Sequence, residues 1–375
     1  MTHLGPYSDL VAAARQSRER SAWRDDLTRH LAFAPREPEP IDPRREKTWQ
    51  ADGIQAEEIT WSCGYGPRTE AWLYYPAEAA SRPFPGLVLL HDHGAFKFWG
   101  KEKVADGPAG MATGLGYFRE LFYGGRALAT VLAQAGFAVL VHDAFMWGSR
   151  RIPGDCMPEN DRRMGRLLYD DDLRADPPGW RELPEETRRY NAAACLHEQT
   201  MAKYATVLGT TLAGIVNFED AIAAAYLKSR ADICNGWIGC AGLSGGGMRS
   251  ALLRGTCERV QAAVVVGAMT TYAGLLDRHV DVHTWMLYPP ALASAGDWTD
   301  VVARRFSSPV LVQYDEDDPL YSPEGMRDAD GKLREAFAGS PFPGNYRAEF
   351  YPGPHKFDRA MQEAAIAWLR GVAGA

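Results

Sequence analysis

The stretch that decides the fold is Trp237-Ile238-Gly239-Cys240-Ala241-Gly242-Leu243-Ser244-Gly245-Gly246-Gly247. An apolar segment runs into the pattern Gly-x-Ser-x-Gly, and the Arg/Ala/Leu-rich residues from Met248 onward predict a helix. A serine hydroxyl is a poor nucleophile unless a sharp strand-to-helix turn holds it clear of the backbone. Gly242 and Gly246 leave room for such a turn to close. The stretch therefore predicts a nucleophile turn at Ser244, and the alternative for the pattern alone is a Gly-rich turn with a solvated serine.

The segments around this turn predict a mostly parallel sheet with helices on both faces. Continuous apolar runs are typical of strands buried on both sides, and they are expected at 87–90, 138–141, 260–266, 309–314 and 346–351. Helices are expected between them or after them, at 126–135, 206–230 and 357–372. The alternation of strand and helix is typical of α/β proteins. A hairpin is expected before this unit, with strands at 57–61 and 69–75.

The domain organisation predicted from the sequence is a single main domain, 46–375, with two additions. Residues 1–45 are expected to form an N-terminal helical extension, helical at 8–33, followed by a linker rich in proline. Residues 148–191 are rich in Arg, Asp, Glu and Pro, too polar for a core and too long for an ordinary connection. We expect this insertion to be a lid or a surface excursion. Residues 143–151, after the strand expected at 138–141, either border a substrate pocket through Trp147 and Arg150 or form a simple turn.

The composition excludes several classes of partner. The 375-residue chain has a formal net charge of −7, which gives no reason to expect nucleic acid or an anionic membrane as a partner. It contains no apolar run of about 18 residues, and we expect no signal peptide, because the first residues lack a basic and an apolar region. Its six cysteines are scattered without a Cys-x-x-Cys pair. The expectation is a cytoplasmic protein with reduced thiols and no cofactor, and a homo-oligomer stays open.

Two later loops carry the partners that a serine nucleophile needs, a general base and an acid that orients it. Asp315-Glu316-Asp317-Asp318-Pro319-Leu320 and Pro352-Gly353-Pro354-His355-Lys356-Phe357 both follow predicted strands. The carboxyl ends of parallel strands gather at one edge of the sheet, where such proteins build their sites. His355 is therefore the expected base, with an ordinary surface histidine as the alternative. The acid stays open at this point among four adjacent acidic residues.

Taken together, these motifs resemble those of the α/β-hydrolase superfamily, and within it those of the dienelactone hydrolase and acetyl xylan esterase-like group. The matching pieces are Leu89-Leu90-His91-Asp92-His93-Gly94, Gly242-Leu243-Ser244-Gly245-Gly246, Asp317-Asp318-Pro319-Leu320 and Gly353-Pro354-His355-Lys356-Phe357. The resemblance covers roughly residues 55 to 373. Dienelactone hydrolase itself uses a cysteine nucleophile, whereas this chain has Ser244, so its lactone substrate is not carried over.

The resemblance also implies which carboxylate is the acid. Loops of this group commonly read Gly-x-x-Asp-x-x-x-Pro, which places Asp315 at the glycine, Asp318 at the acid and Ser322 at the proline. The two flanking positions do not match their residue types, so Asp317 remains an alternative. The implied catalytic set is therefore Ser244, Asp318 and His355.

For the oxyanion hole, the family uses the backbone N–H of the residue after the nucleophile, here Gly245, and one from the loop after an earlier strand. In this chain the second donor is expected to be His93, with Gly94 as the alternative. His91 and His93 also have the spacing of a metal-binding pair on an extended chain. No third ligand follows from the spacing, so no metal is expected.

The predicted function is a serine hydrolase that cleaves a small-molecule carboxylic ester through an acyl-enzyme. The acyl group is expected to be small, with acetyl as one candidate, and the alcohol to be a sugar or another polar alcohol. One alternative is a serine peptidase or amidase of the prolyl-oligopeptidase type, although no β-propeller precedes the domain. A second alternative is a non-catalytic binding protein on a hydrolase scaffold.

Overall fold

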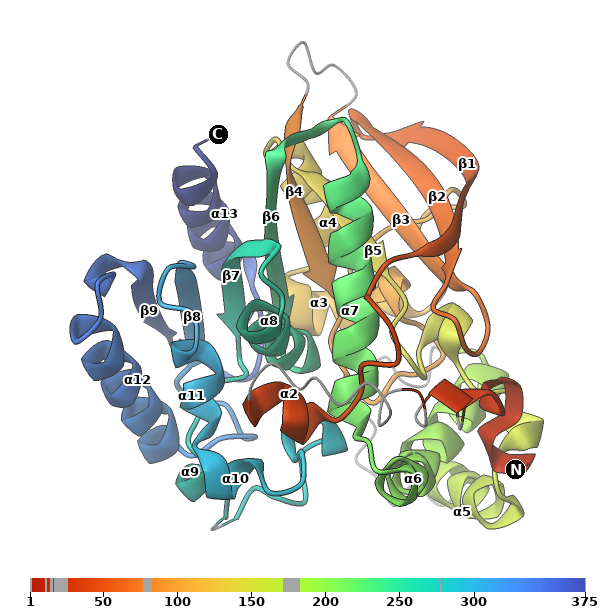
Figure 1. Ribbon diagram of the computed structural model, residues 1–375. Coiled ribbons are helices and arrows are strands. Elements are labelled where there is room, and N and C mark those ends of the chain that lie inside the picture. The colour runs from red at the N-terminus through yellow and green to blue at the C-terminus, as the bar shows by residue number, and fades with distance from the viewer. Residues whose placement is uncertain are drawn as a thin grey trace.

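The computed structural model describes residues 2–10, 12–13, 16, 26–76, 83–170, 183–276 and 278–374. A nine-stranded sheet crosses these residues in the order β1-β2-β3-β5-β4-β6-β7-β8-β9 (Figure 1). The strands are β1 Ile41–Ala51, β2 Ile54–Ser62, β3 Thr69–Pro76, β4 Phe84–Leu90, β5 Ala138–His142, β6 Ile233–Leu243, β7 Val260–Val266, β8 Val310–Asp315 and β9 Tyr346–Tyr351. Pairing is parallel from β5 to β9 along this order and antiparallel from β1 through β3 to β5.

Helices cover both faces of the sheet (Figure 1). One face packs against α7 Leu212–Ser229, α8 Gly245–Thr256 and α12 Pro323–Ala338, and the other against α3 Leu115–Tyr123, α4 Leu128–Gln134 and α13 Arg359–Ala373. Each face has its own hydrophobic core. The central strands contribute to both cores because every residue of β4, β5 and β8 is buried. The predicted α/β architecture is confirmed, and the apolar runs are its buried parallel strands.

The remaining helices connect these layers or lie at one end of the sheet. They are η1 Thr2–Tyr7, α2 Asp26–Leu31, η2 Lys101–Lys103, η3 Gly148–Arg150, η4 Gly154–Cys156, α5 Glu159–Asp170, α6 Glu185–Leu208, α9 Tyr272–Leu276, η6 Trp285–Leu287, α10 Leu292–Ala295, α11 Trp298–Ala303 and η7 Pro343–Asn345. No single helix in these ranges is long and apolar enough to cross a membrane. The pair α6 and α7 meets that test only when joined across an 89° bend.

The N-terminal region differs from the expected helix and linker in one element. Strand β1 pairs with β2 over most of its length and includes Pro43, so the expected boundary at 45/46 falls inside a strand. Proline and charged residues are rare in strand interiors. Because β1 contains both, its composition resembles that of a linker. Of the expected helix at 8–33, α2 is described, and 17–25 lies outside the described residues.

The polar insertion contributes to the core, which corrects the expectation that it is too polar to do so. Arg150 is fully buried, and its guanidinium pairs with the carboxylate of Glu219 on α7. An arginine is tolerated inside a protein when a carboxylate neutralises it. Farther along, α5 packs against α6 so closely that a methyl group on Gly165 would lie 2.8 Å from the Ala193 nitrogen. Residues 171–182 of the expected lid lie outside the described residues.

Candidate active site

Ser244 occupies a sharp turn between β6 and α8. Its backbone has φ 58° and ψ −122°, a conformation that residues with a side chain rarely adopt. The Ser244 N–H donates to the Val266 carbonyl at 2.9 Å, which fastens the turn to β7. A methyl group on Gly242 would lie 2.5 Å from the Gly246 carbonyl carbon, and one on Gly246 would overlap the Leu90 carbonyl oxygen. Backbone contacts therefore require glycine at both positions that the motif predicts.

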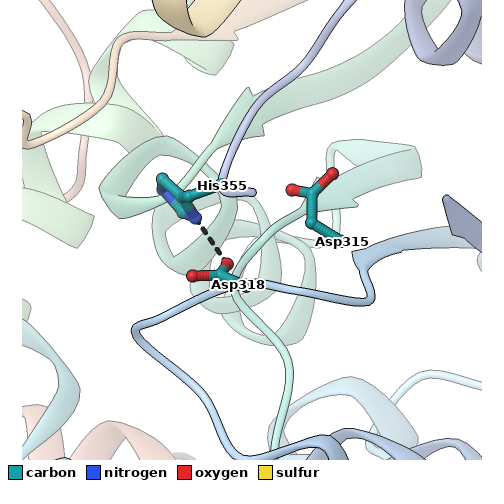
Figure 2. Close-up of side chains that lie close together, drawn as sticks. All are labelled: Asp315, Asp318 and His355. Atoms are coloured by element: carbon teal, nitrogen blue, oxygen red, sulfur yellow. Dashed lines mark hydrogen bonds and ion pairs between the residues drawn. The ribbon is translucent and has the colours of Figure 1, made fainter. Parts of the chain in front are cut away.

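Asp318, which is buried, and His355, which is partly buried, form a hydrogen-bonded pair on the loops after β8 and β9 (Figure 2). The Nδ1–H of His355 donates to Asp318 Oδ2 at 2.6 Å, and Asp318 Oδ1 accepts from the Leu320 N–H at 2.9 Å. Burial lowers the pKa of His355, but the hydrogen bond and charge of Asp318, followed by the charge of Asp315, outweigh it and raise that pKa above its ordinary value. The arrangement fixes the tautomer that leaves Nε2 free to accept a proton.

Ser244 and His355 line one pocket of about 420 Å³. Other residues lining it come from the segments 92–95, 195–199, 243–248, 282–284 and 319–320, and from Phe122 on α3. No hydrogen bond joins Ser244 to His355 in the described part of the chain, and Nε2 of His355 is buried there without a partner. Hydrogen bonds between a nucleophile and its base are often long in proteins without substrate and tighten when it binds.

Backbone N–H groups lie beside the serine on two segments. A methyl group on Gly245 would lie 2.7 Å from the His93 nitrogen, so the loop after β4 packs directly against the start of α8. The first N–H groups of a helix have no partner within the helix and can bind a negative oxygen. His93, Gly94 and Gly245 all line the pocket. The geometry thus brings both expected oxyanion donors to the serine and leaves Gly94 as the alternative.

The side chain of His93 is held by a carboxylate on α6. Its Nε2–H donates to Glu198 Oε2 at 2.7 Å, while its Nδ1 accepts from the Ala95 N–H at 3.1 Å. Glu198 also pairs with the buried ammonium of Lys97. The Nζ atom of Lys97 lies 3.9 Å from the ring centroid of Trp147. Although burial raises the pKa of Glu198, Lys97 and His93 hold it well below its ordinary value. Glu198 is therefore an ionised anchor for the loop after β4.

The other residues expected near the site have separate roles. His91 Nδ1 lies 3.0 Å from the Asp92 carbonyl, and Nε2 accepts from the Ala144 N–H at 3.3 Å. His91 and His93 are thus engaged by different partners. Trp147 donates from Nε1 to the His93 carbonyl at 3.3 Å and supports the loop from behind. Neither Trp147 nor Arg150 is among the described residues that line the pocket.

Sequence reasoning missed two parts of the site. The first is α6, which contributes Cys195, Glu198 and Gln199 to the pocket. Cys195 and Glu198 contact the loop after β4 at residues that lie 100 and 105 positions earlier in the chain. No spacing pattern in the sequence indicates such a contact. The second is the position of Asp315, which the loop pattern placed at its glycine and not beside the base. One oxygen or nitrogen atom from each of Asp315, Asp318 and His355 lies within 4.8 Å of the others (Figure 2).

A mostly parallel sheet with helices on both faces, and a serine turn after a central strand, defines the α/β-hydrolase fold. The chain has this fold. Solved structures with similar folds include a glucuronoyl esterase from Solibacter usitatus, with a TM-score of 0.60, 14% identity and 94% of each chain covered. A protein assigned as an acetyl xylan esterase from Bacteroides fragilis has a TM-score of 0.60 and 15% identity, over 96% of this chain and 89% of that one.

A methylesterase is a further structural neighbour, with a TM-score of 0.53, 16% identity, and coverage of 97% of this chain and 64% of that one. No protein-family model matches the sequence, and no curated protein matches it significantly. These likenesses, at such low identity, show the fold.

Proposed function

We propose that this protein is a serine esterase in which Ser244, His355 and Asp318 form the catalytic triad. The observation that carries the proposal is the convergence of the strained Ser244 turn and the hydrogen-bonded His355–Asp318 pair on one pocket. A nucleophile, a base and a group that orients the base are the parts that acyl transfer requires. Their chain order, Ser, Asp, His, is also that of α/β-hydrolases.

In the acylation step, His355 Nε2 takes the proton of the Ser244 hydroxyl as its oxygen attacks the ester carbonyl. The carbonyl oxygen becomes an oxyanion, which the N–H groups of Gly245 and His93 stabilise. Asp318 stabilises the imidazolium that forms. The imidazolium then returns its proton to the departing alkoxide, so an alcohol leaves and an acyl-serine remains.

In the second step, His355 takes a proton from a water molecule, and the resulting hydroxide attacks the acyl-serine. The tetrahedral intermediate collapses, the acid is released, and the Ser244 oxygen regains a proton from His355. The serine residue is thereby restored, and the net reaction consumes one water for each ester. No metal or redox group enters these steps.

We propose as substrate an ester of a small acyl group, with acetyl as a candidate, on a sugar or another polar alcohol. The pocket volume lies toward the small end of the range for small-molecule sites. Gln199, His283 and Thr284 give one side of the pocket a polar lining. The glucuronoyl esterase and the acetyl xylan esterase are both named for esters of carbohydrate units, which supports the same class here.

The test combines labelling with a substrate panel. A fluorophosphonate probe should label the wild-type protein on Ser244 and fail to label Ser244→Ala, which separates a hydrolase from a non-catalytic binding protein. Nitrophenyl esters of rising acyl length, acetylated sugars, lactones and aryl amides then separate an esterase from an amidase. We expect the highest kcat/KM for the acetyl esters. Absence of labelling, or faster cleavage of amides than of esters, would overturn the proposal.

A further inference from the structure

Two carboxyl groups, and not one, lie beside the imidazole of His355 (Figure 2). Asp318 accepts the Nδ1 hydrogen bond. Asp315, three residues earlier, is the last residue of β8 and is 0% exposed. The oxygen and nitrogen atoms that these three side chains offer lie within 4.8 Å of one another. At that separation, the charge on one group changes the protonation of the others.

Asp315 has little to stabilise a negative charge. Its Oδ2 accepts one hydrogen bond, from the Lys356 N–H at 3.0 Å. Its Oδ1 is buried and has no hydrogen-bond partner among the described residues. An ionised carboxylate loses its hydration when buried, whereas a protonated one does not carry that cost. Burial therefore raises the pKa of Asp315 to about 7, against the opposing effects of the Lys356 N–H and the charge of His355.

The charged and titratable groups that face Asp315 come from two loops. Asp318, on the loop after β8, raises the pKa of Asp315, whereas His355 and Lys356, on the loop after β9, lower it. On β9, Tyr351 is the neighbour of Asp315 in register. Burial and the carboxylate of Glu349 raise the pKa of Tyr351, so its phenol stays uncharged near neutral pH. Asp92 and His283 also act electrostatically on His355, and both line the pocket with it. Burial lowers the pKa of His283 to about 4, so its charge changes below the pH range of Asp315. Asp315 is thus a group beside His355 whose charge changes near neutral pH.

We propose that Asp315 is a positioning residue that controls how readily His355 holds a proton. Its carboxyl group is neutral when protonated. When it is ionised, it adds a second negative charge beside the His355–Asp318 pair. This inference rests on the proposed serine esterase function for its effect on rate. Ionised Asp315 favours the imidazolium. It therefore delays the appearance of the free base as pH rises and helps to stabilise the imidazolium that forms during catalysis.

The test is the pH dependence of kcat/KM for nitrophenyl acetate in wild type, Asp315→Asn and Asp317→Asn, from pH 5 to 9. Asparagine at 315 keeps the acceptor for Lys356 N–H and removes the charge. Asp317 is a matched control, because it lies two residues after Asp315 and also accepts a backbone N–H from the loop after β9, that of Gly353 at 3.0 Å. Unlike Asp315, it is exposed.

In Asp315→Asn we expect the midpoint of the acid limb to fall by about half to one pH unit and the alkaline plateau to drop about tenfold. Asp317→Asn should keep both within about 0.2 pH unit and a factor of two, because water and salt screen an exposed charge. A purely structural role of Asp315 would lower the rate at all pH values without moving the midpoint. An unchanged midpoint in Asp315→Asn would therefore overturn the inference.

A second measurement uses the wild-type protein, so it depends neither on enzymatic activity nor on whether a variant folds. In the full-length wild-type protein, the carboxyl carbon of Asp315 should titrate by NMR between about pH 6 and 8. The His355 ring signals should respond to the same titration. A carboxyl carbon that titrates wholly below about pH 5 would overturn the inference. Fluorophosphonate labelling of Ser244 in the same sample tests the proposed function separately, so failure of either idea is recognised on its own.

Discussion

At the end of β6 the backbone alone fixes the position of Ser244, whereas at the end of β8 the site depends on which side chains are buried. The serine turn closes because Gly242 and Gly246 have no side chains where other backbone atoms pass. Where β8 ends and its loop begins, Asp315 and Asp318 are buried and Glu316 and Asp317 are exposed. The first region depends on glycines without side chains, and the second depends on the free-energy cost of burying charged side chains. The two should therefore respond differently to substitution.

The largest effect is expected at the turn itself. Ser244→Ala removes the nucleophile, and we expect kcat on an activated ester to fall on the order of a million-fold. Alanine fits the space of serine, so the thermal midpoint of unfolding should stay close to that of wild type. Steady-state kinetics and a melting curve on the same preparation test both statements. A variant that kept a tenth of the wild-type rate would remove Ser244 from the mechanism.

The next effect distinguishes residues within the β8 loop. Asp318→Asn keeps the shape of the acid but favours the wrong tautomer of His355, and we expect a loss of roughly ten-thousand-fold in kcat. Asp317→Asn, at an exposed position, should keep the rate within about a factor of two, because water and salt screen its charge. Both are measured on one activated ester. If Asp317→Asn were the more damaged variant, the acid would have to be moved to Asp317.

A smaller effect is expected where the two oxyanion donors meet. In Gly245→Ala, the added methyl group would lie 2.7 Å from the His93 nitrogen and should push the loop after β4 away from the turn. Displacing one oxyanion donor should cost about a hundredfold in kcat. Gly331→Ala is the control, because its added methyl group meets no atom within 4 Å. Equal rates for both variants would show that this contact does not shape the oxyanion hole.

The smallest effect concerns the pocket wall formed by α6. Gln199 lines the pocket, and its side-chain oxygen accepts a hydrogen bond of 2.8 Å from the indole N–H of Trp285. Losing one such bond is worth about 1 kcal/mol, so Gln199→Ala should change KM for esters of bulky alcohols by roughly three- to tenfold. The KM for nitrophenyl acetate should stay unchanged. A parallel change for small and bulky substrates would place Gln199 outside the substrate-contacting wall.

The sequence predicted the parts of the molecule that depend on local pattern. The parallel strands were visible as apolar runs, and Ser244 and His355 stood out because each follows such a run within a short motif. Asp318 needed a register taken from related loops, and the structure gives it the hydrogen bond to His355. Ser244, Asp318 and His355 remain a proposed triad, with the variants above as their test.

The rest depends on contacts that no local pattern indicates. Glu198 contacts His93, which lies 105 residues earlier in the chain. Nothing in the sequence of α6 around Glu198 indicates this contact. Arg150 is buried opposite Glu219, which neutralises its charge, and the sequence shows the charge without the partner. Strand β1 has the composition of a linker because it is exposed along nearly all of its length. In each case, tertiary pairing overrides what composition favours.

Strand β1 also bears on how copies of this protein can associate. An outermost strand offers unpaired backbone groups that a second molecule could use to extend the sheet. Here that edge contains Pro43, which has no N–H to give, and two irregularities in its register with β2. It also presents a dense series of charged side chains, Asp42, Arg44, Arg45, Glu46 and Lys47. Continuous sheets formed across two copies are therefore disfavoured at β1.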